Sequence, residues 1–291
     1  MCLNQSKTLR LLMPQWQGGG NNPLYPLGAR LMSWLAPNDG SAVVEVPVAP
    51  YDGKDPGVED GIFARSALMK QLKAARRIID AYEPDRLIVF GGDCSSAQAP
   101  LAYLNERYGG ELGLLWIDRH PDVKTPKEAA NLHTMVLGHL LGRGDPGFSR
   151  EVQVPLKPEK VMFAGLGTVI AQEEEVITGL GIRRAGAQEL THGSHAVLQW
   201  IKDSDIKFLA IHLDVDVLDP ALFRSLQAGN PEADPNASVR TGEMTFVQVA
   251  RLIVEVSDKT DVVGLGFAEH MPWDAYNLKG MLEKIPILNN G

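Results

Sequence analysis

The segment Leu112-Gly113-Leu114-Leu115-Trp116-Ile117-Asp118-Arg119-His120-Pro121-Asp122 joins an apolar run to three residues of the kinds that bind metal ions. The run has the length of a buried strand, and Asp118, His120 and Asp122 follow it at every second position. Alternate side chains of an extended backbone lie on one side. The spacing therefore predicts a metal-binding cluster at a strand end. Taken alone, the segment also fits a strand followed by a polar turn at Pro121.

Similar apolar runs recur along the chain, separated by stretches with apolar residues at helical spacing. The runs predict strands at residues 9–13, 43–48, 86–90, 112–117, 160–164, 182–185, 208–213 and 262–267. The intervening stretches predict helices at residues 66–82, 97–108, 132–141, 194–202 and 245–257. Such alternation is typical of parallel strands joined by helical crossovers.

The ends of several helices and the remaining stretches complete this picture. Thr245 and Ser194 are expected as N-caps, and Gly109-Gly110 should end the helix before them. Irregular segments are expected at residues 17–25, 51–61, 123–131, 142–158 and 223–242. Several follow strands, and ligands of open parallel sheets bind beyond the carboxyl ends of the strands. These segments should form the walls of a pocket, within a single domain that covers residues 1–291.

Composition limits the class of protein. The 291 residues are 44% hydrophobic, enough for a large core, and the formal net charge of −8 argues against binding to nucleic acid. The two cysteines, Cys2 and Cys94, do not form a disulfide framework. No apolar run approaches the roughly 18 residues of a membrane span. We expect a cytoplasmic protein without membrane or nucleic-acid partners.

Two further motifs resemble the first in position. Gly91-Gly92-Asp93-Cys94-Ser95 follows the predicted strand at residues 86–90, and Asp214 and Asp216 end the strand at residues 208–213 before Asp219-Pro220. Each alone also fits an ordinary feature, a tight turn with a buried inert thiol and a half-buried strand entering an Asp-Pro turn. Carboxylates gathered at one rim of a sheet repel one another unless cations neutralise them. Together the motifs favour a metal centre.

The three motifs in combination resemble those of the arginase, agmatinase and formimidoylglutamase superfamily, the ureohydrolases. The resemblance spans residues 86–272, and the alternating pattern extends it to nearly the whole chain. It implies an α/β fold of three layers, α/β/α, with an eight-stranded, mostly parallel sheet and two divalent metal ions, most commonly manganese. Relatives form homo-oligomers, which we therefore expect here.

The resemblance also implies a set of ligands. Asp118 and Asp214 would bridge both ions, Asp122 and Cys94 would complete one site, and His120 and Asp216 the other. Carboxylate and imidazole ligands suit manganese. A hydroxide that bridges the two ions would attack an amidine or guanidinium carbon and break a C–N bond.

Catalytic and substrate roles follow from the same resemblance. His133 is expected to shuttle protons and Glu269 to face the guanidinium group, with Asp122 as a further catalytic residue. Lys124, Asn131 and Glu269 are the candidate substrate contacts. Ordinary alternatives remain open, since His133 and Glu269 fit exposed positions at helix starts and Lys124 fits a solvated loop lysine.

The chain departs from the family pattern at Cys94, where relatives have histidine. A thiolate ligand adds a negative charge and makes zinc, iron or cobalt credible. After Gly165-Leu166-Gly167 no acid occurs before Glu173, whereas arginases place an aspartate there for the α-amino group. Ordinary L-arginine is therefore not the expected substrate. His212, on the same face as Asp214, could support that ligand or be a buried structural histidine.

We expect a metal-dependent hydrolase of linear C–N bonds, acting on a small cationic or zwitterionic guanidino, amidino or formimidoyl compound. One alternative is an enzyme that uses Cys94 as a nucleophile with His120 or His133 as its base. Another is a regulatory or structural relative that binds one ion or none.

Overall fold

The computed structural model describes residues 6–37, 40–41, 43–233, 241–285 and 287. Eight strands form one sheet in the order β2-β1-β5-β10-β9-β6-β7-β8, and every pairing is parallel. The strands are β1 (Thr8–Met13), β2 (Val43–Glu45), β5 (Arg86–Gly91), β6 (Gly113–Ile117), β7 (Val161–Ala164), β8 (Arg183–Ala185), β9 (Phe208–Asp214) and β10 (Asp261–Ala268). All eight predicted strands are confirmed, although β2 is shorter than expected. Cys2 and part of the predicted irregular segment 223–242 lie outside the described residues.

The central strand β6 shows why its sequence is apolar throughout rather than alternating. All five of its residues are buried. Leu114 and Trp116 join the core on one face of the sheet, whereas Leu115 and Ile117 join the core on the other. A parallel strand covered on both faces needs apolar residues at every position.

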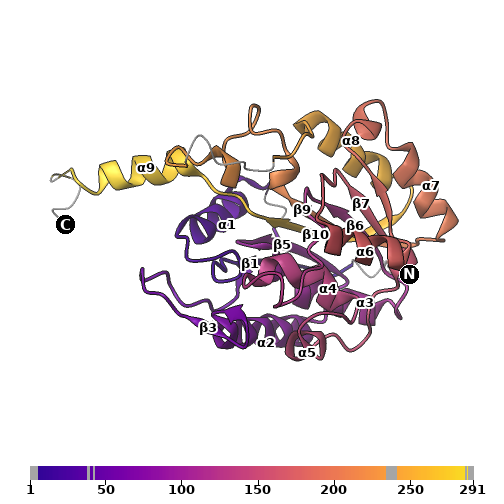
Figure 1. Ribbon diagram of the computed structural model, residues 1–291, viewed down its shortest axis with the longest axis horizontal. Helices are drawn as coiled ribbons and strands as arrows, with labels where there is room; N and C mark the ends of the chain where they lie inside the picture. The colour runs from indigo at the N-terminus through magenta and orange to yellow at the C-terminus, as the bar shows by residue number, and fades with distance from the viewer. Residues whose placement is uncertain (1–5, 38–39, 42, 234–240, 286, 288–291) are drawn as a thin grey trace.

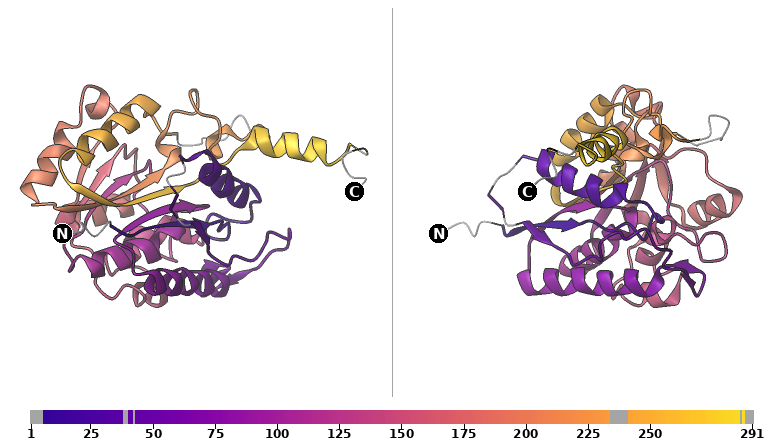
Figure 2. Two further views of the ribbon diagram at one scale, coloured as in Figure 1. Left: turned by 180° about the vertical axis from the view of Figure 1, so that it is seen from behind. Right: turned by 90° about the vertical axis from the view of Figure 1, so that its left-hand side faces the viewer.

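Helices cover both faces of the sheet, which makes three layers (Figures 1 and 2). The core on one face includes side chains from α2 (Arg65–Tyr82), α3 (Gln98–Arg107), α4 (Val136–Leu140) and α6 (Ala171–Leu180). The cores on the other face include side chains from α1 (Leu24–Leu35), α7 (His195–Asp203) and α8 (Phe246–Ser257). The predicted α/β/α architecture is therefore confirmed.

Cap predictions had mixed outcomes. Thr245 caps α8, where its side chain accepts a hydrogen bond from the backbone N–H of Gln248 at 3.2 Å. Ser194 is the N-cap residue of α7, as predicted, but its side chain makes no capping hydrogen bond. Gly109 and Gly110 follow α3 with φ of 67° and 78°, a conformation that glycine adopts without strain.

Several elements were not predicted. Helix α1 begins within the segment expected to be irregular, and α6 and α9 (Trp273–Leu282) were not recognised. The short helix α5 (Pro146–Ser149) and the small hairpin of β3 (Val58–Glu59) and β4 (Ile62–Phe63) also lie in or beside segments expected to be irregular. Helix α9 has no buried residue and extends away from the body (Figure 1). Across the described part of the chain, no helix combines the length and apolar character needed to traverse a bilayer.

Candidate metal centre

The order of the strands brings four functional segments to one edge of the sheet. Strands β5, β10, β9 and β6 are consecutive neighbours, and parallel pairing places their carboxyl ends together. In the register of the sheet, Ile117 pairs with Leu213 and Ala268 pairs with Asp214. Asp118, which follows Ile117, is therefore beside Asp214, and Glu269, which follows Ala268, lies on the other side of Asp214.

A tight turn after β5 presents Cys94 to this edge. A Cβ atom on Gly92 would lie 1.8 Å from the carbonyl oxygen of Gln15, so the turn requires glycine there. The carboxylate of Asp93 accepts a hydrogen bond from the backbone N–H of Ser95 at 3.0 Å and starts a short 3₁₀ helix. The Cys94 Sγ atom is consequently buried, 3.0 Å from Asp214 Oδ2.

The segment after β6 is not the extended backbone that its spacing predicted. The strand ends at Ile117, and the chain then bends, with the His120 N–H donating to Asp118 Oδ1 at 2.6 Å. Asp122 has φ of 49°, in the left-handed region that non-glycine residues rarely occupy. The three side chains still approach the same edge, but a turn brings them there rather than strand alternation.

The segment after β9 differs from its prediction in the same way. The strand ends at Asp214, and Asp216 lies in the 3₁₀ turn Val215–Val217. Asp214 Oδ1 accepts a hydrogen bond from the backbone N–H of Asp216 at 2.7 Å. The Asp216 carboxylate in turn lies 3.0 Å from His120 Nδ1, which links the second and third motifs.

His133 and Glu269 form a pair at the same edge. His133 lies in a 3₁₀ turn (Leu132–Met135), and its Nδ1 is 2.9 Å from Glu269 Oε1. Glu269 has φ of 63°, and its backbone N–H donates to the Gly92 carbonyl at 2.8 Å. Neither side chain is at an exposed helix start: Glu269 is buried and His133 half-buried.

Three groups of these side chains have the geometry to hold a cation. Within each group, potential ligand atoms lie within 4.8 Å of one another. The groups are Cys94, Asp118 and His212; Cys94, Asp214 and Glu269; and Asp118, His120 and Asp216. Their thiol, imidazole and carboxylate donors suit a first-row divalent metal.

Unpaired buried oxygens support the same reading. Within the described residues, Asp122 Oδ2 and Asp216 Oδ1 are buried without a hydrogen-bond partner. Buried polar atoms are almost always satisfied in native proteins. Among the described residues, Asp122 belongs to none of the three potential ligand groups. It nevertheless lines the cavity that contains Cys94, His120, Asp214 and Asp216.

The carboxylates of this edge repel one another. Burial, together with the charges of Asp214, Asp122 and Asp216, raises the pKa of Asp118 well above its ordinary value. Burial and the charges of Asp216 and Glu269 do the same to the pKa of Asp214. Burial raises the pKa of Asp122 to about 7. Only a nearby cation would keep all these groups ionised at neutral pH.

The thiol and the imidazoles respond differently. Burial and then the charge of Asp214 raise the pKa of Cys94 well above its usual range. Burial lowers the pKa of His133, but the neighbouring Glu269 carboxylate outweighs it and raises the pKa to about 9. Burial lowers the pKa of His212 to about 3. His133 is therefore a cation and His212 a neutral ring in the protein without bound metal.

A cavity of about 380 Å³ opens above these groups. Its lining includes the predicted residues Cys94, His120, Asp122, Lys124, Asn131, His133, Asp214, Asp216 and Glu269, with Asp118 fully buried beside them. Parts of three of the five segments expected as pocket walls contribute, whereas residues 51–61 and 142–158 contribute none of the lining residues.

Eight lining residues, Tyr25 and Glu173 among them, were not assigned to the site individually from the sequence. Glu173 is buried at the start of α6, where its Oε1 lies 3.7 Å from Lys124 Nζ. Tyr25 is buried at the start of α1. Tyr25 ends the segment 17–25, which was expected as a pocket wall, whereas Glu173 lies far in sequence from the three motifs and outside every expected wall segment.

Comparison with known proteins places the chain in a family. The sequence model of the Arginase family matches residues 41–273. An arginase of Staphylococcus aureus is 27% identical over 143 residues, which are 46% of each protein. An arginase of Eremothecium gossypii is 29% identical over 195 residues, which are 64% of this chain and 46% of that protein. The chain thus aligns with about half the length of the curated relatives that it matches.

Solved structures share the fold. The Entamoeba histolytica arginase in complex with L-ornithine superposes with a TM-score of 0.77 at 17% identity and covers 92% of each chain. The formimidoylglutamase of Bacillus subtilis superposes with a TM-score of 0.66 at 12% identity, covering 92% of this chain and 81% of that one. The family match over most of the sequence and the shared eight-stranded architecture lead to one conclusion: the chain belongs to the arginase family.

Proposed function

We propose that this protein is a metal-dependent hydrolase that cleaves a C–N bond of a linear amidine or guanidine other than ordinary L-arginine. The observation that carries the proposal is the convergence of four aspartates, a thiol and a histidine from three strand ends at the base of one cavity. Such a cluster is unstable as a set of free anions and is balanced by two divalent cations.

The proposed ligands are Cys94, Asp118, His120, Asp122, Asp214 and Asp216. Manganese is the expected metal from the family, and the thiol of Cys94 makes zinc, iron or cobalt possible as well. When bound, two such ions would lower the pKa of water enough to supply a hydroxide nucleophile near neutral pH.

The remaining side chains have separate roles in the proposal. Glu269 presents a carboxylate that can accept N–H hydrogen bonds from an amidine or guanidinium group. His133, 2.9 Å from that carboxylate and held protonated by it, can donate a proton to the departing amine. The same pairing orients the Glu269 carboxylate.

The rim of the cavity would contact the rest of the substrate. Lys124 offers a cation there, partly balanced by Glu173 at 3.7 Å. Asn131 Nδ2 donates to the Gly19 carbonyl at 3.3 Å and so connects two walls of the cavity. A small cationic or zwitterionic substrate suits a cavity with carboxylates at its bottom and with cationic, anionic and amide side chains at its rim. By analogy with relatives, we also propose a homo-oligomer.

Nucleophilic attack by Cys94 is the second candidate. Its Sγ lies 3.9 Å from Glu269 Oε1, and the nearest potential bases are carboxylates. Burial and these negative charges raise the pKa of the thiol, which is the opposite of what a nucleophilic cysteine needs. A bound cation would relieve both effects, so the metal hypothesis accounts better for the same geometry.

The test combines metal analysis of the purified protein with turnover of a panel of guanidino, amidino and formimidoyl compounds. We expect about two divalent ions per chain and loss of turnover after chelation, restored by adding metal. Cys94→His should preserve or increase a metal-centred activity and destroy a covalent one. Full activity in the metal-free protein would overturn the proposal, and absence of both metal and turnover would leave the non-catalytic alternative.

A further inference from the structure

We propose that His212 is a ligand of the ion at Cys94, so that Cys94, Asp118 and His212 together form one site with sulfur, oxygen and nitrogen donors. This inference rests on the proposed function, because it requires that an ion binds at Cys94. It changes the ligand set that the family resemblance implies, which does not include His212.

The position of His212 on β9 supports a direct role. His212 precedes Asp214 by two residues, so both side chains lie on one face of the strand. Its Nε2 is 4.0 Å from Asp118 Oδ2. Metal–ligand distances of about 2.0–2.3 Å place neighbouring ligand atoms about 3–4 Å apart, so an ion fits between these two groups.

The imidazole has two nitrogens that the protein does not satisfy. His212 is 1% exposed, and neither ring nitrogen has a hydrogen-bond partner among the described residues. Leaving a buried polar atom unsatisfied destabilises the folded state. The ring is nevertheless held in place by stacking on Trp116, with ring centroids 3.8 Å apart and planes at 20°. An ion would use the free lone pair of a ring that is already oriented.

Charge balance favours this ligand set. Cys94 and Asp118 supply one thiolate and one carboxylate, whose two negative charges neutralise one divalent ion, and His212 adds a neutral donor. The set implied by the resemblance for this ion combines the thiolate with Asp122 and with Asp118 and Asp214, which it shares between the two ions, and it contains no neutral donor. A site of sulfur, nitrogen and oxygen donors selects zinc or cobalt over manganese. The imidazole absent at position 94 is thus supplied from β9.

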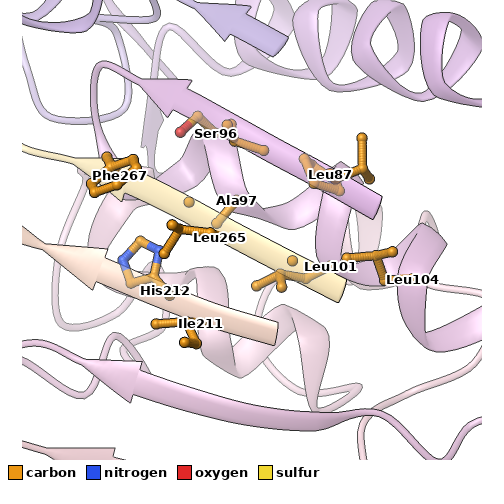
Figure 3. A pocket seen from close by; sticks show the side chains of 13 residues that line it. Leu87, Ser96, Ala97, Leu101, Leu104, Ile211, His212, Leu265 and Phe267 are labelled. Carbon is orange, nitrogen blue, oxygen red and sulfur yellow. The ribbon is translucent and has the colours of Figure 1, made fainter. Parts of the chain in front are cut away.

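Space for the other ring nitrogen lies beneath the site. His212 lines a small cavity of about 20 Å³ together with Ser96, Leu265 and Phe267 (Figure 3). Gly266 on β10 leaves part of this space open. Metal-bound histidines commonly donate their second ring N–H to an oxygen acceptor, and the hydroxyl of Ser96 is the polar side-chain group that lines this cavity beside His212.

The experiment titrates the chelated, full-length protein with Co²⁺ and follows thiolate-to-cobalt charge-transfer absorption together with bound cobalt by equilibrium dialysis. The wild type should bind two equivalents, one of which produces the charge-transfer band. His212→Ala should weaken that equivalent at least tenfold and leave the other in place. His212→Asn, which keeps a polar side chain, serves as a second variant, and thermal unfolding checks that each variant is folded.

His139→Ala is the matched control. His139 is also a fully buried histidine stacked on an aromatic ring, that of Phe148, but among the described residues it belongs to none of the three potential ligand groups. Its loss should leave the cobalt titration unchanged. If His212→Ala and His212→Asn both bind cobalt with the affinity and spectrum of the wild type, the inference is wrong and the proposed function stands. If the wild type binds no cobalt, both are wrong.

Discussion

Two clusters of acidic side chains in this protein differ in the groups that their carboxylates face. On the outer surface of α2 and α3, the guanidinium of Arg76 lies 2.8 Å from Asp80 and 2.6 Å from Glu106. Each carboxylate there faces a cation. At the base of the cavity, Asp118 and Asp214 face each other and the Cys94 thiol instead. The chain pairs its acids with cations in the surface cluster and groups them with one another and with a thiol at the candidate metal centre.

The backbone shows the same difference. Arg76, Asp80 and Glu106 lie on regular helices. Asp122 and Glu269, at the base of the cavity, have φ of 49° and 63°. Left-handed conformations of non-glycine residues cost of order 1–3 kcal/mol and gather at functional sites. Strain and repulsion therefore coincide at the candidate centre, and both are absent from the surface cluster.

The largest effect should come from removing a shared ligand. Asp118→Asn should lower turnover by about 10³-fold or more, on the order of 4 kcal/mol, because Asp118 belongs to two of the potential ligand groups. In the chelated protein the same change should raise the thermal midpoint, since folding no longer requires the carboxyl group at position 118 to take up a proton or to be buried as a charge. Asp80→Asn makes the identical chemical change in the surface cluster and should preserve turnover. Normal metal content and turnover in Asp118→Asn would contradict the proposed role of Asp118 as a shared metal ligand.

Removing metal with a chelator should make the free energy of unfolding depend on pH, because the buried carboxylates of the candidate centre then lack a neutralising cation. In the metal-free protein the pKa of Asp122 is about 7, against 3.8 for an ordinary aspartate. Between these values the folded chain binds more protons than the unfolded chain, so its stability falls as the pH rises from about 4 to about 7. The full difference is about 4 kcal/mol. Urea unfolding with chelator or with saturating metal measures it, and equal pH slopes in both conditions would refute the prediction.

At the bottom of the cavity, the pair of His133 and Glu269 resembles the surface cluster, because the carboxylate of Glu269 faces the imidazole of His133. His133→Asn should lower kcat by about 10²-fold while metal binding is retained, since it removes a proton donor and no ligand. Added imidazole should restore part of the rate. Steady-state kinetics and metal analysis check both outcomes, and an unchanged kcat would exclude His133 from proton transfer.

The smallest effect should come from the surface cluster itself. Arg76→Met should lower the free energy of unfolding by about 1 kcal/mol, because its partly exposed ion pairs are screened by water and salt. Turnover should be unaffected. Urea unfolding at low and high salt measures the effect, which should shrink as the salt concentration rises. A loss well beyond this size would mean that the surface cluster is as critical to the molecule as the cavity.

Much of this arrangement could be predicted from local sequence. Apolar runs of strand length predicted all eight sheet strands, and helical spacing predicted α2, α3, α7 and α8. These patterns are local because burial on both faces or on one side of an element leaves its period in the sequence. Helix α9, without a buried face, and α6, with only Glu173 and Ile177 buried, leave almost no such pattern.

The sequence by itself also determined which residue types end the strands, and parallel connections required those ends to meet at one edge of the sheet. Only the tertiary structure decided that β5, β10, β9 and β6 are neighbours, that turns rather than extended backbone orient Asp122 and Asp216, and that His212 approaches Cys94. Spacing along a strand specifies the face on which a side chain lies. The strand that packs beside it is chosen by contacts between segments far apart in the chain.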